Sequence, residues 1–321
     1  MNRVAVLGAG AWGTAIASVL AARLDVTLWA RDRAQAEAVA RTRRNERYLP
    51  GIAIPDTVKV TSAFPSADLM LAATPVAGLR DLLKDVKGAP LVWLCKGFER
   101  NTGLLPHQIV EQALGAGARC GALSGPSFAQ EVARGLPCAL TLAARDAAFA
   151  REAAAVVHGG RMRVYYSADL VGVEIGGAVK NVMAIAAGIS DGLGLGHNAR
   201  AALITRGLAE IARLGVALGG QPDTIFGLTG AGDLILTATG DLSRNRRVGL
   251  QLAQGQPLQT ILQNLGHVAE GVSTAREVAK LAKSRGVEMP VTDAVNAVLE
   301  GKLTPKAAVE QLLSRDPKSE R

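Results

Sequence analysis

The sequence predicts an α/β protein in which a doubly wound parallel sheet is followed by an all-helical domain. An apolar, strand-like run at 3–7 leads directly into Gly8, Gly10 and Gly13, and a helical pattern follows them. Strand-like and helix-like runs then alternate as far as residue 168, beyond which only helical periodicity remains. We therefore predict two domains, spanning residues 1–168 and 169–321.

Composition supports this class of fold. The chain has 321 residues, more than one domain usually holds. Hydrophobic residues make up 49% of it, but aromatic residues only 3%. The core must therefore be built mainly from Ala, Val, Leu and Ile, which suits closely packed helices and parallel strands.

Charge and hydropathy argue against several functions. The net charge is +8, but Lys and Arg are spread along the chain, and the one local cluster, at 41–47, comes with no recognition motif. We expect no nucleic-acid partner and an anionic small-molecule substrate. No run approaches the roughly 18 apolar residues of a membrane span, and Met1 leads straight into the first strand. We expect a cytoplasmic protein without membrane insertion.

Cysteine and histidine spacing indicates neither disulfides nor a metal site. The three cysteines lack CxxC spacing, which indicates free thiols. They are Cys95, Cys120 and Cys138. The four histidines are isolated, without a second ligand at metal spacing, so we expect surface or hydrogen-bonded side chains and no metal. They are His107, His158, His197 and His267.

The first turn gives the clearest functional signal. Gly8, Gly10 and Gly13 stand in GxGxxG spacing between a strand and the helical run 14–22. Gly8 permits a tight turn, Gly10 lets a pyrophosphate approach bare backbone, and Gly13 lets the helix lie close on the sheet. The phosphates would lie at the helix N-terminus. We predict dinucleotide binding here; the alternative is a purely structural turn.

The end of the second strand, 25–30, bears on the choice of cofactor. An acidic residue there is typical of NAD enzymes, whereas an arginine accommodates the 2'-phosphate of NADP. The chain offers Arg31, Asp32 and Arg33. NADPH is favoured if Arg31 faces the ribose while Asp32 caps the helix 33–43, and a register shift of one residue would favour NADH. The alternative is a plain helix cap flanked by solvated arginines.

Further strands are predicted at 58–61, 69–74, 91–95, 120–123, 138–143 and 163–166, with helices at 76–83, 128–133 and 146–157. Ligands of such sheets lie beyond the carboxyl ends of the strands. Lys96 follows one such end, where cofactor and substrate should meet, unless it is only a solvated charge. Ser127 is predicted to cap the helix 128–133. The amides of its turn could also bind substrate oxygens.

Helical periodicity then predicts helices at 170–187, 199–218, 248–254, 258–265, 272–285, 290–300 and 305–313. The first contains Gly176 and Gly177, which cost about 1 kcal/mol each relative to alanine in mid-helix. Close approach of another backbone or of a ligand would explain them. Lys180 follows on the same rigid helix, where a buried ammonium can donate a proton to a carbonyl oxygen. The alternative is a lysine that snorkels from a packed helix.

Two later motifs complete the candidate site. The run 227–233 is predicted to be a glycine loop that ends in the carboxylate of Asp233, which could instead cap an apolar helix. Ser243 is predicted to stand at a helix start with Arg244 and Asn245 in the first turn. That geometry suits a phosphate group, although Arg244 could be only a surface charge.

With these motifs assembled, the sequence resembles the bacterial-type NAD(P)-dependent glycerol-3-phosphate dehydrogenases over nearly its full length. The matching stretches are GAGAWGTA at 8–15, NERYLPG at 45–51, KGFE at 96–99, LSGPSFAQEV at 123–132, GAVKNVMAIAAG at 177–188, LTGAGDLILT at 228–237, SRNRRVG at 243–249 and VAEGVSTA at 268–275. The resemblance implies reversible reduction of dihydroxyacetone phosphate to sn-glycerol 3-phosphate with NADP(H) and also NAD(H). It also implies a homodimer that supplies glycerophospholipid synthesis.

The resemblance further implies roles for single residues. Lys180 matches the catalytic acid/base, which also touches the substrate. The other substrate-binding positions are Lys96, Gly125, Ser127, Asp233, Ser243, Arg244 and Asn245. The cofactor-binding positions, beside the three glycines of the turn, are Trp12, Arg31, Lys96, Ala129, Arg244, Val268 and Glu270. Ala11 departs from the family, because many members have a hydroxyl residue there that can contact the cofactor.

Two rival functions share parts of this pattern. Another reductase of the same architecture, such as a ketopantoate reductase or a 3-hydroxyacid dehydrogenase, would not need the phosphate-binding run 243–245. A protein that senses NADP without chemistry would not need Lys96, Lys180 and Asp233 to converge.

Overall fold

The computed structural model describes residues 1–265, 269–317 and 319. Contacts divide the chain into two compact units, which we call the sheet unit (Met1–Glu99 with Leu104–Glu174) and the helical unit (Arg100–Gly103 with Ile175–Arg321). The dividing point lies inside the long helix α7 (Leu170–Gly192). The boundary between residues 168 and 169 stays a prediction.

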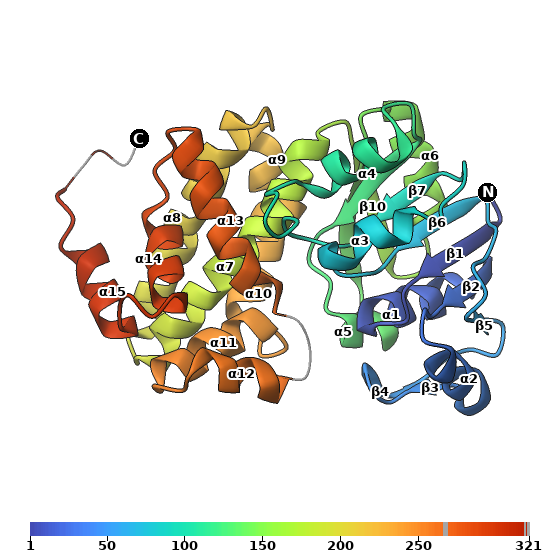
Figure 1. The fold of residues 1–321 in the computed structure, drawn as a ribbon, viewed down its shortest axis with the longest axis horizontal. Helices are drawn as coiled ribbons and strands as arrows, with labels where there is room; N and C mark the ends of the chain where they lie inside the picture. The colour runs from blue at the N-terminus through green and yellow to red at the C-terminus, as the bar shows by residue number, and fades with distance from the viewer. Residues whose placement is uncertain (266–268, 318, 320–321) are drawn as a thin grey trace. The chain divides into compact units, whose positions relative to one another are not determined.

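The sheet unit is built on an eight-stranded sheet in the order β10-β9-β8-β7-β6-β1-β2-β5 (Figure 1). In register, Val6 of β1 lies between Leu28 of β2 and Leu71 of β6. The strands are β1 (Arg3–Leu7), β2 (Asp25–Trp29), β5 (Lys59–Thr61), β6 (Leu69–Ala72), β7 (Leu91–Trp93), β8 (Cys120–Ser124), β9 (Cys138–Ala143) and β10 (Met162–Ser167).

The sheet is parallel, as predicted, except at the pairing of β8 with β9. β9 pairs antiparallel with β8, and β10 runs parallel to β9. The connection from β8 to β9 contains only the five-residue helix α5 (Ala129–Ala133). Because β9 runs antiparallel to β8, it starts near the edge of the sheet at which β8 ends, and the connection does not have to cross back along β8.

Helices cover both faces of this sheet. Val4 and Val6 of β1 point into one hydrophobic core, which includes residues of α1 (Ala11–Leu20), α2 (Arg33–Thr42) and α6 (Ala147–Val157). Ala5 and Leu7 point into the other, with α3 (Val76–Leu83) and α4 (Pro106–Leu114). Because helices cover both faces of the sheet, the unit is doubly wound, as the sequence predicts.

Two elements of the sheet unit escaped prediction. One is α4, and the other is a hairpin of β3 (Arg44–Asn45) and β4 (Leu49–Ala53). The hairpin lies beside α1 and α2 (Figure 1). A two-residue strand is too short to show an alternating pattern, which explains why sequence periodicity missed it.

The helical unit is all-helical in the part that the structure describes, as predicted. It continues α7 and adds α8 (Gly196–Ala217), α9 (Pro222–Phe226), the π-helical turn η1 (Leu228–Gly232), α10 (Asp233–Thr239), α11 (Arg244–Ala253), α12 (Leu258–Leu265), α13 (Glu270–Ser284), α14 (Pro290–Leu299) and α15 (Pro305–Leu313).

The predicted glycine loop at 227–233 was wrong, because this run is helical. Gly232 N–H donates to the carbonyl of Gly227 at 3.1 Å, the spacing of a π-helix. A Cβ on Gly230 would lie 1.9 Å from the carbonyl oxygen of Ile225. The glycines therefore serve close packing against α9 and do not form an extended loop.

The central helix α7 is long and apolar enough to cross a membrane. However, 94% of its most apolar window is buried inside the protein, as expected of a core helix. It packs unusually close to α11: a Cβ on Gly188 would lie 2.0 Å from the carbonyl oxygen of Arg246, and one on Gly249 would lie 2.1 Å from that of Ile185. These glycines fix the first turn of α11 against α7.

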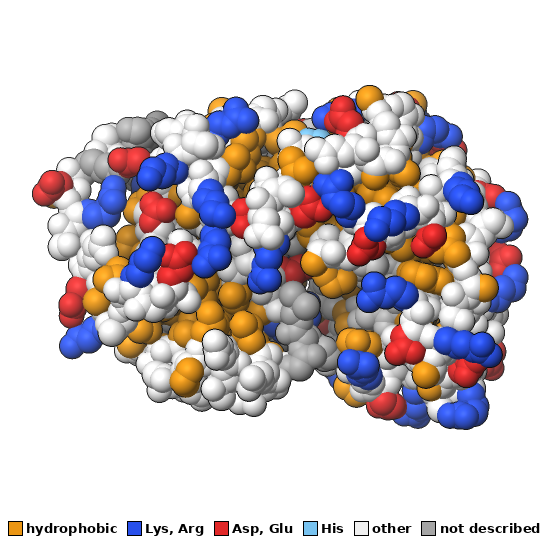
Figure 2. Space-filling model, in the orientation of Figure 1, with side chains coloured by type: hydrophobic (Ala, Val, Ile, Leu, Met, Phe, Trp, Pro, Cys, Tyr) orange, Lys and Arg blue, Asp and Glu red, His pale blue; other side chains and the backbone are white. Residues whose placement is uncertain are grey.

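Surface charge and thiols agree with the sequence analysis. Lys and Arg side chains are interspersed with Asp and Glu on the visible face of each unit (Figure 2). The three cysteines are free thiols at partly buried positions.

A buried carboxyl ties α8 to α14. Glu210, 1% exposed, accepts hydrogen bonds from the N–H groups of Val291 at 2.7 Å and Thr292 at 3.1 Å, and from the Thr292 hydroxyl at 3.0 Å. Burial raises the pKa of Glu210 to about 7, because loss of water outweighs these hydrogen bonds to the carboxylate.

This raised pKa predicts a pH-dependent stability. The pKa of Glu210 in the folded state lies above its ordinary value of 4.5. The contribution of Glu210 to stability is therefore complete below pH 4.5 and is lost as pH rises through about 7. Between about pH 5 and pH 8, we expect the free energy of unfolding to fall by on the order of 2 kcal/mol more in the wild type than in Glu210→Gln, which cannot titrate. Chemical denaturation measures this difference, and parallel pH profiles of the two proteins would contradict it.

Candidate functional site

The glycine turn after β1 has one open and two crowded positions. Gly8 has a φ of +123°, and a Cβ there would lie 2.9 Å from the carbonyl oxygen of Ala73. A Cβ on Gly13 would lie 1.9 Å from the carbonyl oxygen of Gly8. At Gly10 a Cβ would meet nothing within 4 Å. This geometry fits the roles predicted for the three glycines: a tight turn, close helix packing and an open approach to the backbone.

The helix that follows is suited to an anion. Gly10 is the N-cap of α1 and offers no side-chain cap, and no acidic residue stands in the first turn, which contains Trp12. The first N–H groups of a helix have no partner inside it and carry its partial positive charge. The turn thus fits a dinucleotide diphosphate, which would lie against Gly10 and the start of α1.

After β2, Asp32 lies as the prediction of NADPH binding requires. Its carboxylate accepts from the N–H groups of Ala34 at 2.9 Å and Gln35 at 3.2 Å, so it caps α2. Arg33 is paired with Glu37 at 2.7 Å. Arg31 is exposed immediately beyond the strand end, within electrostatic range of Asp81.

Three predicted residues of the sheet unit come together beyond β7 and β8. Lys96 donates to the carbonyl oxygen of Gly125 at 3.2 Å, and the hydroxyl of Ser127 donates to the same oxygen at 3.0 Å. Gly125 has a φ of +136°, and a Cβ there would lie 3.0 Å from the carbonyl oxygen of Ala139. The prediction that Ser127 caps the next helix was wrong, because Phe128 is the N-cap and Ala129 the first residue of α5.

In the helical unit, Lys180 lies in a buried ion pair. Its side chain is only 8% exposed, and its ammonium donates to the carboxylate of Asp233 and, at 2.9 Å, to the hydroxyl of Thr237. A buried ammonium is stable only with such a counterion and saturated hydrogen bonds. Thr237 was missed in the sequence analysis. Its i, i+4 spacing from Asp233 is a signal only once the segment is known to be a helix.

Glycines bring this pair together. A Cβ on Gly176 would lie 2.9 Å from the carbonyl oxygen of Thr229 in η1. The turn therefore packs directly on α7, and α10, which begins at Asp233, follows beside Lys180. This confirms the expectation that a mid-helix glycine in α7 marks the close approach of another backbone.

The start of α11 matches its prediction. Ser243 is the N-cap, and its hydroxyl accepts from the N–H of Arg246 at 3.2 Å. Arg244 is exposed at the first helical position. The buried Asn245 donates to the side chain of Asn181 at 2.9 Å and accepts from the N–H of Gly271 at 3.1 Å. Asn245 therefore joins α7, α11 and α13, a bridge that the sequence did not reveal.

Of two further predicted cofactor positions, one lies at the start of α13. Glu270 is its first residue. Val268 lies outside the described residues.

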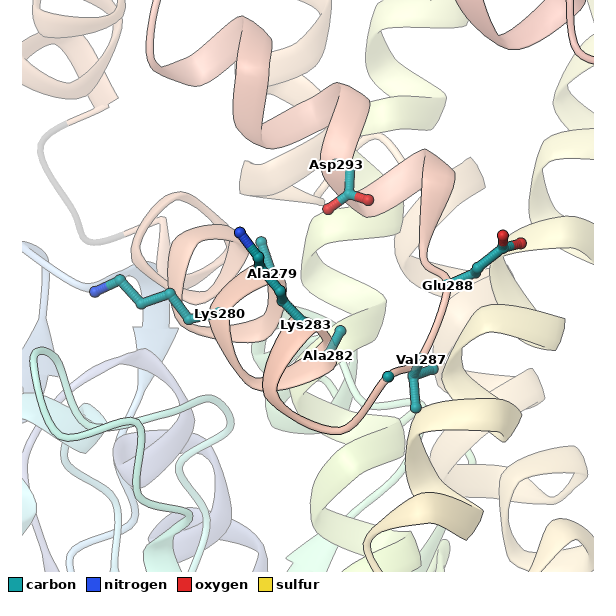
Figure 3. A pocket seen from close by; sticks show the side chains of 8 residues that line it. Ala279, Lys280, Ala282, Lys283, Val287, Glu288 and Asp293 are labelled. Carbon is teal, nitrogen blue, oxygen red and sulfur yellow. The ribbon is translucent and has the colours of Figure 1, made fainter.

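A separate pocket of about 510 Å³ lies where α13 turns into α14 (Figure 3). Lys280 and Lys283 of α13, Glu288 of the connection and Asp293 of α14 line it. None of these residues belongs to the predicted site. Among residues 1–265, 269–317 and 319, no cluster of three or more His, Cys, Asp or Glu side chains could hold a metal ion.

A glycine turn suited to a dinucleotide on a doubly wound sheet, with a buried lysine on a separate helical unit, is typical of one class: nicotinamide-dependent dehydrogenases with a helical second domain. The comparisons with known proteins are specific within that class. The family models described as the N-terminus and the C-terminus of NAD-dependent glycerol-3-phosphate dehydrogenase match residues 3–150 and 169–310. The chain belongs to this family and is an NAD(P)-dependent oxidoreductase.

Individual relatives match over their full lengths. The glycerol-3-phosphate dehydrogenase [NAD(P)+] of Aromatoleum aromaticum is 60% identical over 99% of this chain and 100% of its own length. That of Dechloromonas aromatica is 58% identical over 99% of both chains. The crystal structure of glycerol-3-phosphate dehydrogenase from Coxiella burnetii has a TM-score of 0.92 at 40% identity, covering 98% of this chain and 99% of that one.

The buried pair predicts a large stability loss when it is broken. Asp233→Ala leaves the Lys180 ammonium buried without its counterion, so we expect it to lower the free energy of unfolding by about 3 kcal/mol. Asp241→Ala is the matched control, because Asp241 pairs with Arg246 at 2.9 Å in the same unit but its side chain is 98% exposed. That change should cost at most about 1 kcal/mol. Equal losses in denaturant titrations would show that burial does not matter here.

Proposed function

We propose that the protein catalyses the reversible, NAD(P)H-dependent reduction of dihydroxyacetone phosphate to sn-glycerol 3-phosphate, with Lys180 as proton donor and acceptor. The observation that carries this proposal is the ammonium of Lys180, buried on α7 and held by Asp233 and Thr237. A fixed, water-poor ammonium can give its proton to a ketone oxygen as that oxygen gains negative charge.

The nicotinamide cofactor, when bound, supplies the hydride. Lys180 then protonates the developing alkoxide, and Asp233 keeps the ammonium in position. Lys96, fixed by the carbonyl of Gly125 next to Ser127, adds positive charge for the substrate oxygens. In the reverse direction, Lys180 in its neutral form takes up the hydroxyl proton of glycerol 3-phosphate.

The substrate phosphate is assigned to the first turn of α11. Ser243 caps this helix and Arg244 stands exposed at its start, where a helix N-terminus and a guanidinium both favour an anion. Asn245 uses its oxygen and one amide hydrogen within the protein, so its proposed phosphate contact takes the second amide hydrogen. Binding energy from this remote group would orient the ketone for reaction.

The cofactor is assigned to the turn of Gly8, Gly10 and Gly13. Its further proposed contacts are Trp12, Arg31, Lys96, Ala129, Arg244, Val268 and Glu270. We also propose, from the family resemblance, that the protein is a cytoplasmic homodimer that supplies glycerophospholipid synthesis.

Lys180→Ala tests the chemistry. We expect this change to lower kcat by about 10² to 10⁴-fold, because general acid catalysis is lost, while NADPH still binds. The measurement is NADPH oxidation with dihydroxyacetone phosphate, run beside ketopantoate to separate the rival reductase. Lys283→Ala, which removes an exposed lysine of the same unit, is the control and should leave kcat unchanged. Near-normal turnover in Lys180→Ala would refute the assignment.

Arg31→Ala tests the cofactor preference. With Asp32 turned into the helix cap, Arg31 is the side chain that can pair with the 2'-phosphate of NADPH. We expect wild-type kcat/KM to favour NADPH by about tenfold, and Arg31→Ala to lose most of that advantage. Arg33→Ala is the control, because Arg33 is paired with Glu37. A wild-type preference for NADH, measured at low salt, would contradict the proposal.

A further inference from the structure

A buried amide outside the proposed site holds the glycine turn in place. Asn45, in the short strand β3, is only 2% exposed. Its amide nitrogen donates to the carbonyl oxygen of Ala9 at 3.0 Å and to the hydroxyl of Thr14 at 2.8 Å. The side chain of Gln35 in α2 donates to the same Ala9 carbonyl at 2.8 Å. Two amides from separate elements thus converge on one peptide of the turn.

That peptide joins Ala9 to Gly10. A trans peptide is planar, so its C=O and N–H point in opposite directions. With the Ala9 carbonyl fixed toward Asn45 and Gln35, the Gly10 N–H is turned away from them. A Cβ on Gly10 would meet nothing within 4 Å, so the backbone is open at this residue. The two amides therefore determine the direction of the Gly10 N–H, a possible hydrogen-bond donor to a phosphate.

The hairpin explains why the amide can be this rigid. Asn45 pairs with Leu49 across the hairpin, and its own carbonyl accepts from the N–H of Tyr48 at 3.1 Å. The backbone of Asn45 is thus held by β4 while its side chain reaches α1. A side chain with no N–H, such as aspartate, could not donate to the Ala9 carbonyl and would place negative charge beside it.

We propose that Asn45, supported by Gln35, is a positioning residue for the cofactor diphosphate: it orients the Ala9–Gly10 peptide and does not itself touch the cofactor. This inference rests on the proposed function, in which the turn of Gly8, Gly10 and Gly13 binds that diphosphate. It gives a function to the start of the NERYLPG stretch, which the substrate and cofactor assignments leave unused.

The experiment compares ligands with and without a diphosphate. NADPH and ADP-ribose contain it, whereas adenosine 2'-monophosphate has only the adenosine end that Arg31 is proposed to bind. In Asn45→Asp we expect the Kd of NADPH and of ADP-ribose to rise by about tenfold or more, with that of adenosine 2'-monophosphate within about twofold of wild type. KM for NADPH should rise accordingly, with kcat at saturating cofactor unchanged.

Gln35→Met keeps the test decisive if Asn45→Asp fails to fold. Gln35 is only partly buried, so its loss leaves the core intact while removing one of the two donors to Ala9. Gln35→Met should weaken the binding of ADP-ribose selectively, by a smaller factor than Asn45→Asp does. Equal weakening of all three ligands, or no weakening of ADP-ribose, overturns the inference. If wild-type protein binds neither NADPH nor ADP-ribose, the proposed function fails first, and the inference falls with it.

Discussion

The buried ion pair between Lys180 and Asp233 constrains how α10 packs on α7. Removing two charges from water costs several kcal/mol per ion, and their attraction repays this only with close contact and saturated hydrogen bonds. Thr237 provides the additional partner for the ammonium at 2.9 Å. Contact at this range requires α10 to begin directly beside α7, and Gly176 and Gly230 allow this because a Cβ at either would strike a backbone carbonyl.

Two backbone carbonyls of the sheet unit each hold two polar side chains. The Gly125 carbonyl holds both Lys96 and Ser127, and the Ala9 carbonyl holds Asn45 and Gln35. Carbonyl oxygens have two lone pairs, so each can bind two donors without leaving either unpaired. A phosphate ligand accepts hydrogen bonds, so it could not use these carbonyl acceptors. The N–H groups at the start of α1 have no partner inside the helix and can donate to such a ligand.

The sequence predicted those parts of the fold that depend on local pattern. The bounds of β1, β9, α3, α12 and α15 match their predicted apolar runs. The direction of β9 has no such local signal. Hydrophobic periodicity is the same for either direction, and only the pairing with β8 distinguishes them. The hairpin of β3 and β4 was not predicted because β3 has only two residues, too few to show an alternating pattern.

The candidate site likewise has parts that the local sequence predicts and parts that it does not. The cap at Ser243 and the cap at Asp32 could be predicted, because capping is decided within a few residues. Ser127 has the same side-chain chemistry, yet its hydroxyl donates back to the carbonyl of Gly125, and Phe128 is the N-cap of the next helix. The run 227–233 is ambiguous in the sequence, because glycine, which has no Cβ, suits both a loop and a helix packed tightly on its neighbours. Packing decides between them, here that of Ile225 against Gly230 and of α7 against η1. The i, i+4 relation of Asp233 and Thr237 becomes visible only after that choice.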